Sequence, residues 1–378
     1  MRAATRHGYS HSVFPGVAVR IVIVGEDAGR AGEFEESLSY FDLGWNVQWL
    51  AEPDAALSSG EPVDVFICGL RLGVVPGPVL LSQVAALHPQ AVRILLLDPD
   101  EDSGSMQGLD CAHRLLSRPL DAGELIEAID SVAELRNVLG SEELKQAVGR
   151  VGSLPPPPRL YLELSRLLRD PDASNAAIAQ MLSQDPAIVA KVLRLCNSAY
   201  FSGGREITDI RAAVTRLGHQ QLLRLVLASE AFGPNQLAGK EREAIQDRAL
   251  RTSRLARRLL AGPSAELAAT AGLLAEVGKL LPGVSDGSEG SSGPHYAEAG
   301  AYLLGLWGLP MPIVEGVAFQ HRPGRLKASG FWVAGAVHVA SSLVAGAPVD
   351  EGYLRGVNVL DRLPQWRDLV EPSAAQAA

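Results

Sequence analysis

Charged side chains follow the apolar segments in the first third of the chain. Glu26 and Asp27 follow an apolar segment that ends at Val24, and Arg118 follows a short segment at 114–116 that contains two leucines. Carboxylates in such a turn are able to hold Mg²⁺ or take part in phosphoryl transfer, and a cation is able to neutralise phosphoryl oxygens. This group of residues is the first candidate for chemistry.

Histidines and carboxylates recur in the second half, but their spacing does not suit a metal. His295, His321 and His338 lie far apart in sequence, and none pairs with a carboxylate at metal-ligand spacing. The three cysteines, Cys68, Cys111 and Cys196, form no CxxC pair and are interpreted as small core residues. A catalytic metal needs several convergent ligands, so no metal and no cofactor are predicted.

A series of arginines is the third candidate. Arg248, Arg251, Arg254 and Arg258 recur at helical steps of three and four residues, with Arg257 adjacent. This spacing predicts one basic helix face. A solvated face is the favoured interpretation, and the binding of an acidic partner or a phosphate ligand stays open.

The elements that carry the first group alternate between strands and helices. Buried strands are predicted at 17–24, 45–50, 63–68, 92–97 and 114–116, and helices at 30–40, 51–57, 77–87 and 121–139. Nearly continuous apolar strands separated by helices favour a doubly wound α/β domain with a parallel sheet. The carboxyl ends of the strands would then place Gly25, Glu26, Gly69, Leu97 and Arg118 at one edge.

After the prolines at 155–158 only helical periods appear, so the rest is predicted to be an all-α bundle. Helices are expected at 160–168, 176–182, 186–196, 210–217, 220–229, 241–260, 266–281, 296–307, 311–319 and 330–343. Ser174, Asp185 before Pro186, and Thr208 are the predicted N-caps. The expected domain order is a flexible tail at 1–16, the α/β domain at 17–139, a linker at 140–153, the bundle at 154–345 and a tail at 346–378.

The α/β part resembles the receiver domain of response regulators. The cues are the acidic turn at Glu26 and Asp27, the run Leu70-Arg71-Leu72-Gly73 and the pair Arg118-Pro119. The resemblance implies that Gly69 stands at the phosphoacceptor position, that Leu97 replaces the switch hydroxyl and that Arg118 replaces the lysine. Because Gly69 has no side chain, we expect a degenerate receiver-like domain that is not phosphorylated there.

The helical part resembles the HDOD domain over about 152–344. The motifs are Gly152-Ser153-Leu154-Pro155, Asp185-Pro186, Asn197-Ser198, Trp307-Gly308-Leu309-Pro310 and His321-Arg322-Pro323. HDOD domains resemble the HD phosphohydrolases, whose metal site uses a His-Asp pair with further His and Asp ligands. Here Ala275-Glu276 falls at the pair, Thr252 or Ser253 near the upstream histidine and Ser341 near the last aspartate. Hydrolysis is therefore not expected. Asn197 is interpreted as a turn residue, and Trp307 with Pro310 as core, rather than as ligand contacts.

Composition limits the remaining classes of function. Hydrophobic residues make up 47% and charged residues 20% of 378, which suits folded domains rather than disorder. The net charge of −9 argues against nucleic-acid binding, because proteins that bind nucleic acids usually carry a basic surface. No apolar run reaches the length of a membrane span, so a cytoplasmic protein is expected.

The resemblances together imply a non-catalytic bacterial signalling regulator that acts through protein–protein contacts. Its partner is unnamed, and a homodimer is one possibility. The alternatives are a metal-dependent HD-type phosphohydrolase and a phosphorylation-driven response regulator. The connection between the domains is short, so Leu135, Val138 and Leu144 are expected to pack between the domains or between protomers.

Overall fold

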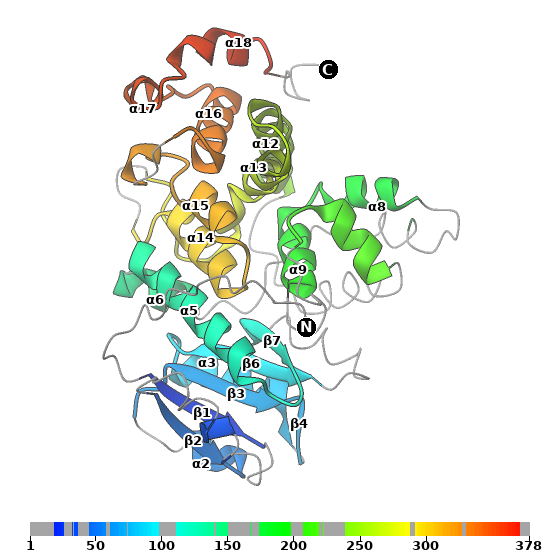
Figure 1. Cartoon of the computed structure of the whole chain (residues 1–378), viewed down its shortest axis with the longest axis vertical. Helices are drawn as coiled ribbons and strands as arrows, with labels where there is room; N and C mark the ends of the chain where they lie inside the picture. The colour runs from blue at the N-terminus through cyan, green and yellow to red at the C-terminus, as the bar shows by residue number, and fades with distance from the viewer. Residues whose placement is uncertain are drawn as a thin grey trace, which may run out of the picture.

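The computed structural model places a parallel sheet at one end of the molecule and a helical bundle at the other (Figure 1). It describes residues 19–25, 32, 34–36, 45–57, 61–73, 75–97, 111–139, 141–149, 167, 174–197, 207–218, 222, 239–287, 292–326 and 330–370. The predicted helices at 30–40, 160–168 and 220–229 lie almost wholly outside these residues.

The sheet has five parallel strands in the order β2-β1-β3-β6-β7. They are β1 (Arg20–Val24), β2 (Asn46–Leu50), β3 (Val65–Gly69), β6 (Val92–Leu97) and β7 (Arg114–Ser117). The helices are α2 (Pro53–Leu57), α3 (Gly77–Leu87) and α5 (Ala122–Val138). Every residue of β3 and β6 is buried, as expected for inner strands of a covered sheet. The predicted doubly wound α/β class is confirmed.

One small element escaped prediction. β4 (Arg71–Leu72) and β5 (Val75–Pro76) form a two-residue antiparallel hairpin directly after β3. Strands this short leave no periodicity in the sequence. The hairpin brings Leu72 back over the carboxyl end of β1.

The second half is helical among its described residues, as predicted. Its elements are α8 (Asn175–Leu182), α9 (Pro186–Cys196), a helix at 210–218, α12 (Gly239–Leu259), α13 (Pro263–Leu274), η1 (Val277–Leu280), α14 (Tyr296–Leu306), α15 (Met311–Ala318), η2 (Pro323–Arg325) and α16 (Val333–Ala345). Ser174 caps α8 as predicted, since its side chain accepts from the backbone N–H of Ala177.

Two local predictions are wrong. The helix expected at 266–281 ends at Leu274 and continues as the tighter η1, where a β-carbon on Gly278 would lie 1.9 Å from the Tyr296 carbonyl oxygen. The missing side chain thus allows α14 to approach closely. The cap of the 210–218 helix is Asp209, not Thr208, because Asp209 Oδ1 accepts from the backbone N–H groups of Arg211 and Ala212.

The segment expected to be a tail is folded up to residue 370. It contains α17 (Glu351–Gly356), η3 (Leu360–Arg362) and α18 (Leu363–Arg367). Leu354 and Trp366 are buried, and the Trp366 ring stacks on Phe331 with 4.9 Å between ring centroids. These elements are too short for a clear helical period, so the sequence pattern missed them.

The two parts of the chain pack directly on one another. α6 (Glu142–Gly149) lies within the predicted linker, and both α5 and α6 contact α14. Leu135 is fully buried, and a β-carbon on Gly305 of α14 would lie 2.6 Å from its Cδ1. The prediction that Leu135 packs between the domains is confirmed. Among the described residues, no helix is both long and apolar enough to span a bilayer.

Candidate functional sites

At the carboxyl end of the sheet, the chain's own side chains fill the space that a receiver site would use. A β-carbon on Gly69 would lie 2.0 Å from Arg118 Nη2, so the guanidinium occupies the place of the missing side chain. A β-carbon on Gly25 would lie 2.0 Å from Leu72 Cδ2. Leu97 is fully buried, and its carbonyl accepts the backbone N–H of Arg118. The structure therefore brings the predicted positions 69, 97 and 118 together.

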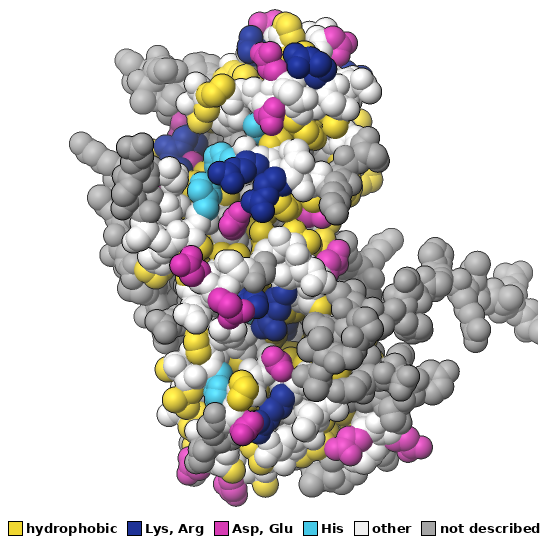
Figure 2. Space-filling view, turned by 90° about the vertical axis from the view of Figure 1, so that its left-hand side faces the viewer, with side chains coloured by type: hydrophobic (Ala, Val, Ile, Leu, Met, Phe, Trp, Pro, Cys, Tyr) yellow, Lys and Arg dark blue, Asp and Glu magenta, His cyan; other side chains and the backbone are white. Residues whose placement is uncertain are grey.

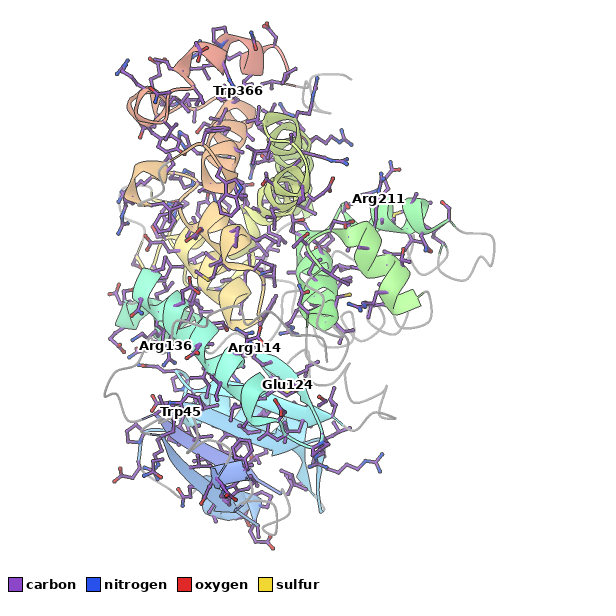
Figure 3. The ribbon with its side chains drawn as sticks, in the orientation of Figure 1. Trp45, Arg114, Glu124, Arg136, Arg211 and Trp366 are labelled. Atoms are coloured by element: carbon purple, nitrogen blue, oxygen red, sulfur yellow. The ribbon has the colours of Figure 1, made fainter. Side chains whose placement is uncertain are left out.

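The two acidic residues predicted for this edge, Glu26 and Asp27, lie outside the described residues. A carboxylate that sequence reasoning did not single out lies beyond the end of β7. Glu124 of α5 accepts a hydrogen bond from Ser117 Oγ at 3.2 Å, and burial raises its pKa above the ordinary value. Its position is labelled in Figure 3.

The place where an HD metal site would fall is built from α12, the α13–η1 junction and α16. Thr252 and Ala275 are buried there, and Ser341 Oγ donates to the carbonyl of His338. Glu276 is the one predicted acid. Its carboxylate accepts from Arg248 Nε at 2.9 Å and from Lys279 Nζ, so two cations of the same chain hold it.

Beside this carboxylate lies a cluster of aromatic and imidazole rings. Tyr296 Oη lies 2.7 Å from His321 Nε2, and the ring centroids of His295 and His321 are 5.2 Å apart. Burial, together with the neighbouring His295 and Lys279, lowers the pKa of His321 to about 4. His321 is therefore neutral near pH 7.

His338 is held by the backbone on both ring nitrogens. Nε2 accepts the Asp350 N–H at 2.9 Å, so Nδ1 carries the proton and donates to the Gln320 carbonyl at 2.7 Å. Burial lowers its pKa. The donor set does not fit a catalytic metal: Glu276 is bound to two cations and His338 to the backbone. Among the described residues, no group of three or more His, Cys, Asp or Glu side chains is placed around one point.

The motif residues of the bundle occupy structural positions. Asp185 Oδ1 accepts from the backbone N–H groups of Ala187 and Ile188 at the start of α9. Asn197 exchanges two 2.8 Å hydrogen bonds with the backbone of Ile207 and so joins the end of α9 to the next segment. Trp307 is buried, and Pro310 precedes α15 as its N-cap residue. Ser198 lies outside the described part of the chain.

The arginines of the predicted basic face on α12 have several different partners within the chain. Arg248 forms an ion pair with Glu276, and Arg251 Nη1 lies 3.6 Å from Asp247 Oδ2. Arg258 donates to the Leu369 carbonyl. The reason is that α12 packs against α13 and α16 and also contacts the C-terminal segment. On the face shown in Figure 2, basic and acidic side chains of the described residues are interspersed.

A set of partly or fully buried arginines at the domain boundary was missed by sequence reasoning. Arg114 of β7 donates to the Leu306 and Gly305 carbonyls at 2.8 and 3.0 Å and to Ser131 Oγ at 2.6 Å. Arg194 of α9 donates to the Ala112 carbonyl, and its guanidinium lies 4.3 Å from the centre of the Trp307 ring. Figure 3 shows Arg114 between the sheet and the bundle.

A third arginine of this set joins the sheet to α6. Arg93 of β6 is buried, with hydrogen bonds from its guanidinium to the carbonyls of Cys111 and Gly149. An arginine within an otherwise apolar strand was the available signal, because a buried cation requires hydrogen-bond acceptors.

Comparison with known proteins identifies one segment of the helical part. Residues 154–283 match the HDOD domain family. The chain carries an HDOD domain. An uncharacterized protein of Treponema pallidum (strain Nichols) is 30% identical over 196 residues, which are 46% of this chain and 38% of that relative. The chain thus spans less than half the length of this curated relative.

Two solved structures are similar to parts of this chain at low identity. The MmoQ response regulator of Methylococcus capsulatus is 20% identical, with a TM-score of 0.44, covering 57% of this chain and 98% of that one. An HDOD domain protein of unknown function from Geobacter sulfurreducens is 19% identical, with a TM-score of 0.29, covering 65% and 93%. At such scores the fold assignment rests on the strand order and the family match. The chain therefore joins a parallel five-stranded α/β domain to the HDOD match at residues 154–283.

Proposed function

We propose that this protein is a non-catalytic, cytoplasmic regulator whose HDOD domain contacts a regulatory protein partner. Its receiver-like unit acts without phosphorylation, as a platform that fixes the orientation of the bundle. One observation carries the proposal: the chain's own side chains occupy both places where chemistry would occur. Arg118 takes the space beside Gly69, and Arg248 with Lys279 holds Glu276.

The position that matches the phosphoacceptor, Gly69, has no side chain for phosphoryl transfer. A phosphoacceptor needs a carboxylate oxygen able to attack phosphorus. Gly69 supplies none, and any side chain added there would collide with the Arg118 guanidinium. An aspartate alone would therefore not restore the site, because Arg118 must also move.

The contact between the two units supports a fixed platform rather than a loose tether. Arg114 binds two carbonyls at the end of α14, and Arg194 reaches back to the carbonyl of Ala112. Hydrogen bonds from a charged donor each contribute about 1.5–3 kcal/mol. Several such bonds, with Leu135 buried beside them, favour one relative placement of the units.

Two measurements test the proposed absence of chemistry. Incubation with acetyl phosphate and Mg²⁺ is expected to leave the intact mass unchanged, while a receiver domain with its acceptor aspartate gains a phosphoryl group. Hydrolysis of bis(p-nitrophenyl) phosphate with Mn²⁺ should stay at the buffer level. A phosphoryl group mapped to residues 17–139, or hydrolysis that Glu276→Ala removes, would contradict the proposal.

The platform role has its own test. Arg114→Met keeps the aliphatic stem but removes the donors to α14, so the radius of gyration in solution scattering should increase. Capture of partner proteins from a lysate by the full-length chain should weaken in parallel. Arg20→Met is the matched control, because the Arg20 guanidinium pairs with Glu61 and donates to Gln48 of β2. A scattering curve identical to that of the unmodified protein would refute the fixed placement.

A further inference from the structure

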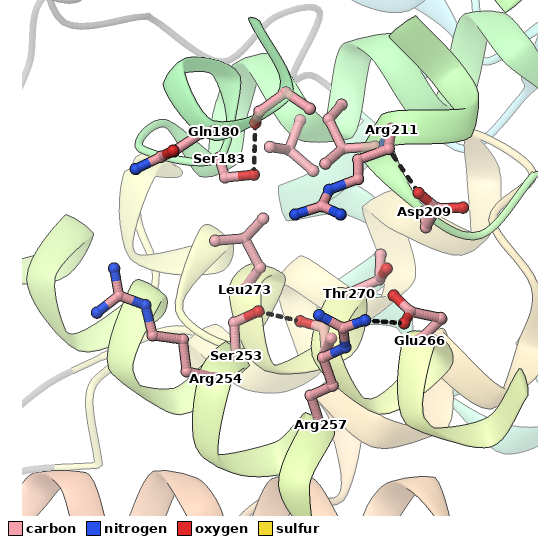
Figure 4. A pocket seen from close by; sticks show the side chains of 14 residues that line it. Gln180, Ser183, Asp209, Arg211, Ser253, Arg254, Arg257, Glu266, Thr270 and Leu273 are labelled. Carbon is pink, nitrogen blue, oxygen red and sulfur yellow. Dashed lines mark hydrogen bonds and ion pairs between the residues drawn. The ribbon is translucent and has the colours of Figure 1, made fainter. Parts of the chain in front are cut away.

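A cavity of about 580 Å³ lies between α8, α9 and the 210–218 helix on one side and α12 with α13 on the other (Figure 4). Small-molecule sites commonly have volumes of about 300–1,000 Å³. Three arginines line the cavity: Arg211 from the 210–218 helix, and Arg254 and Arg257 from α12. Figure 4 shows Arg211 and Arg257 reaching in from opposite sides.

The guanidinium of Arg211 makes no hydrogen bond or ion pair to any residue that the structure describes. Its neighbour Asp209 already accepts two backbone N–H groups. Arg257 Nη2 lies 2.7 Å from Glu266 Oε1, and their side chains are 55% and 38% exposed. An exposed pair of this kind is weak, and a guanidinium has five donors, so Arg257 retains donors for an incoming anion.

Hydroxyl groups in the cavity are oriented to accept rather than donate. Ser183 Oγ donates its proton to the Ala179 carbonyl and Ser253 Oγ to the Ala269 carbonyl, both at 2.8 Å. Thr270 Oγ1 donates to the Thr208 carbonyl. Their remaining lone pairs accept hydrogen bonds, so they suit ligand O–H or N–H groups and not phosphate oxygens.

The rest of the lining is partly apolar, from Ala179, Val189, Ile210 and Leu273. The lining thus combines planar cations for an anion, acceptors for hydroxyl or amine groups, and apolar surface for a ring. Arginine forks match phosphate oxygens in pairs, which gives both strength and orientation.

We propose that this cavity binds a phosphate-bearing small molecule of nucleotide size, with the phosphate on Arg211, Arg254 and Arg257 and the sugar or base on the hydroxyl lone pairs. This function goes beyond the proposed protein contacts. The bound ligand joins the α8–α9 side of the HDOD domain to α12 and α13, and so supplies an input signal to the bundle.

The test uses calorimetric titration of the full-length chain with AMP, GMP and ribose 5-phosphate, and with adenosine as the ligand that lacks phosphate. At least one phosphate ester should bind with a Kd below about 1 mM, and adenosine at least about 10-fold more weakly. Arg211→Gln should weaken binding of that ester by about 10-fold or more, since a charge-assisted contact is lost. Arg211 is exposed, so this change should leave the melting temperature unaltered.

Arg355→Gln on α17 is the matched control, because Arg355 is exposed and lies outside the cavity lining. It should leave the Kd unchanged. Arg257→Gln provides a second variant from the opposite wall. The proposal is overturned if no phosphate ester binds, if adenosine binds equally well, or if Arg211→Gln and Arg257→Gln both retain the original Kd. Failure here leaves the phosphodonor and scattering tests of the platform unaffected.

Discussion

The contact between Leu135 of α5 and Gly305 of α14 gives a quantitative test of how the two units are joined. A β-carbon on Gly305 would lie 2.6 Å from Leu135 Cδ1 and 2.7 Å from Cδ2. Leu135 is fully buried and has little space into which to move. Gly305→Ala should therefore force the units apart or strain the leucine, while Leu135→Ala should open the space that the new methyl group needs.

The expected magnitudes follow from these contacts. Overpacking a buried contact costs about 1–3 kcal/mol. Alanine is preferred to glycine in a helix by about 1 kcal/mol, so the net loss for Gly305→Ala is about 0–2 kcal/mol. Leu135→Ala should cost about 2–5 kcal/mol through lost burial and a cavity. The double variant should lose about 1–3 kcal/mol less than the sum of the single variants, because one change fills the space left by the other.

Urea unfolding followed by circular dichroism measures the four free energies of this cycle, and solution scattering reports the placement of the units. Gly356→Ala is the control, since no atom lies within 4 Å of the added β-carbon. It should not interact with Leu135→Ala. Strictly additive losses, with an unchanged radius of gyration for Gly305→Ala, would refute the close approach of α5 and α14.

Three further changes test other parts of the structure. Gly69→Asp should lower the free energy of unfolding by about 1–3 kcal/mol through its clash with Arg118. Adding Arg118→Ala should recover part of the lost melting temperature. An unchanged stability of Gly69→Asp would contradict the conclusion that the Arg118 guanidinium fills the space beside Gly69. The pKa of His321 is lowered to about 4, so the unfolded chain takes up the proton first and stability should fall as the pH drops from about 6.5 to 4. His321→Gln should flatten that fall in thermal melts, and an unchanged slope would argue against the assignment. Trp366→Ala should cost about 3–5 kcal/mol in urea unfolding, and a loss below 1 kcal/mol would mean that α18 is not part of the core.

Regular elements could be predicted from the sequence where a long pattern repeats. The bounds of α3 and β6 agree with the expected 77–87 and 92–97, because eleven residues of helical period and a six-residue strand with five apolar residues leave little ambiguity. The hairpin β4–β5 and the helix α18 were missed, because two to five residues cannot show a period. The site positions 69, 97 and 118 were found together because parallel strands end at the same edge.

What the arginines do could not be predicted, because their partners are remote in the chain. Arg114 binds carbonyls that are 191 and 192 residues away, and the Gly69–Arg118 contact depends on two strands that both flank β6. No local pattern encodes such contacts. The arginine series on α12 illustrates the same limit. Its spacing predicts that the side chains share one face of the helix, but it does not predict the residues with which they pair.

Under the proposed function, these arginines also explain why single substitutions should not restore chemistry. An acidic side chain placed at Gly69 would collide with the Arg118 guanidinium, and the Glu276 carboxylate is already paired with Arg248 and Lys279. Arginine suits these positions because its charge persists when buried and its five donors satisfy several acceptors at once. The same residue type joins the units through Arg114 and lines the cavity through Arg211. Replacement of Arg118 or Arg248 alone should therefore disturb the packing around it and should not create an enzymatic activity.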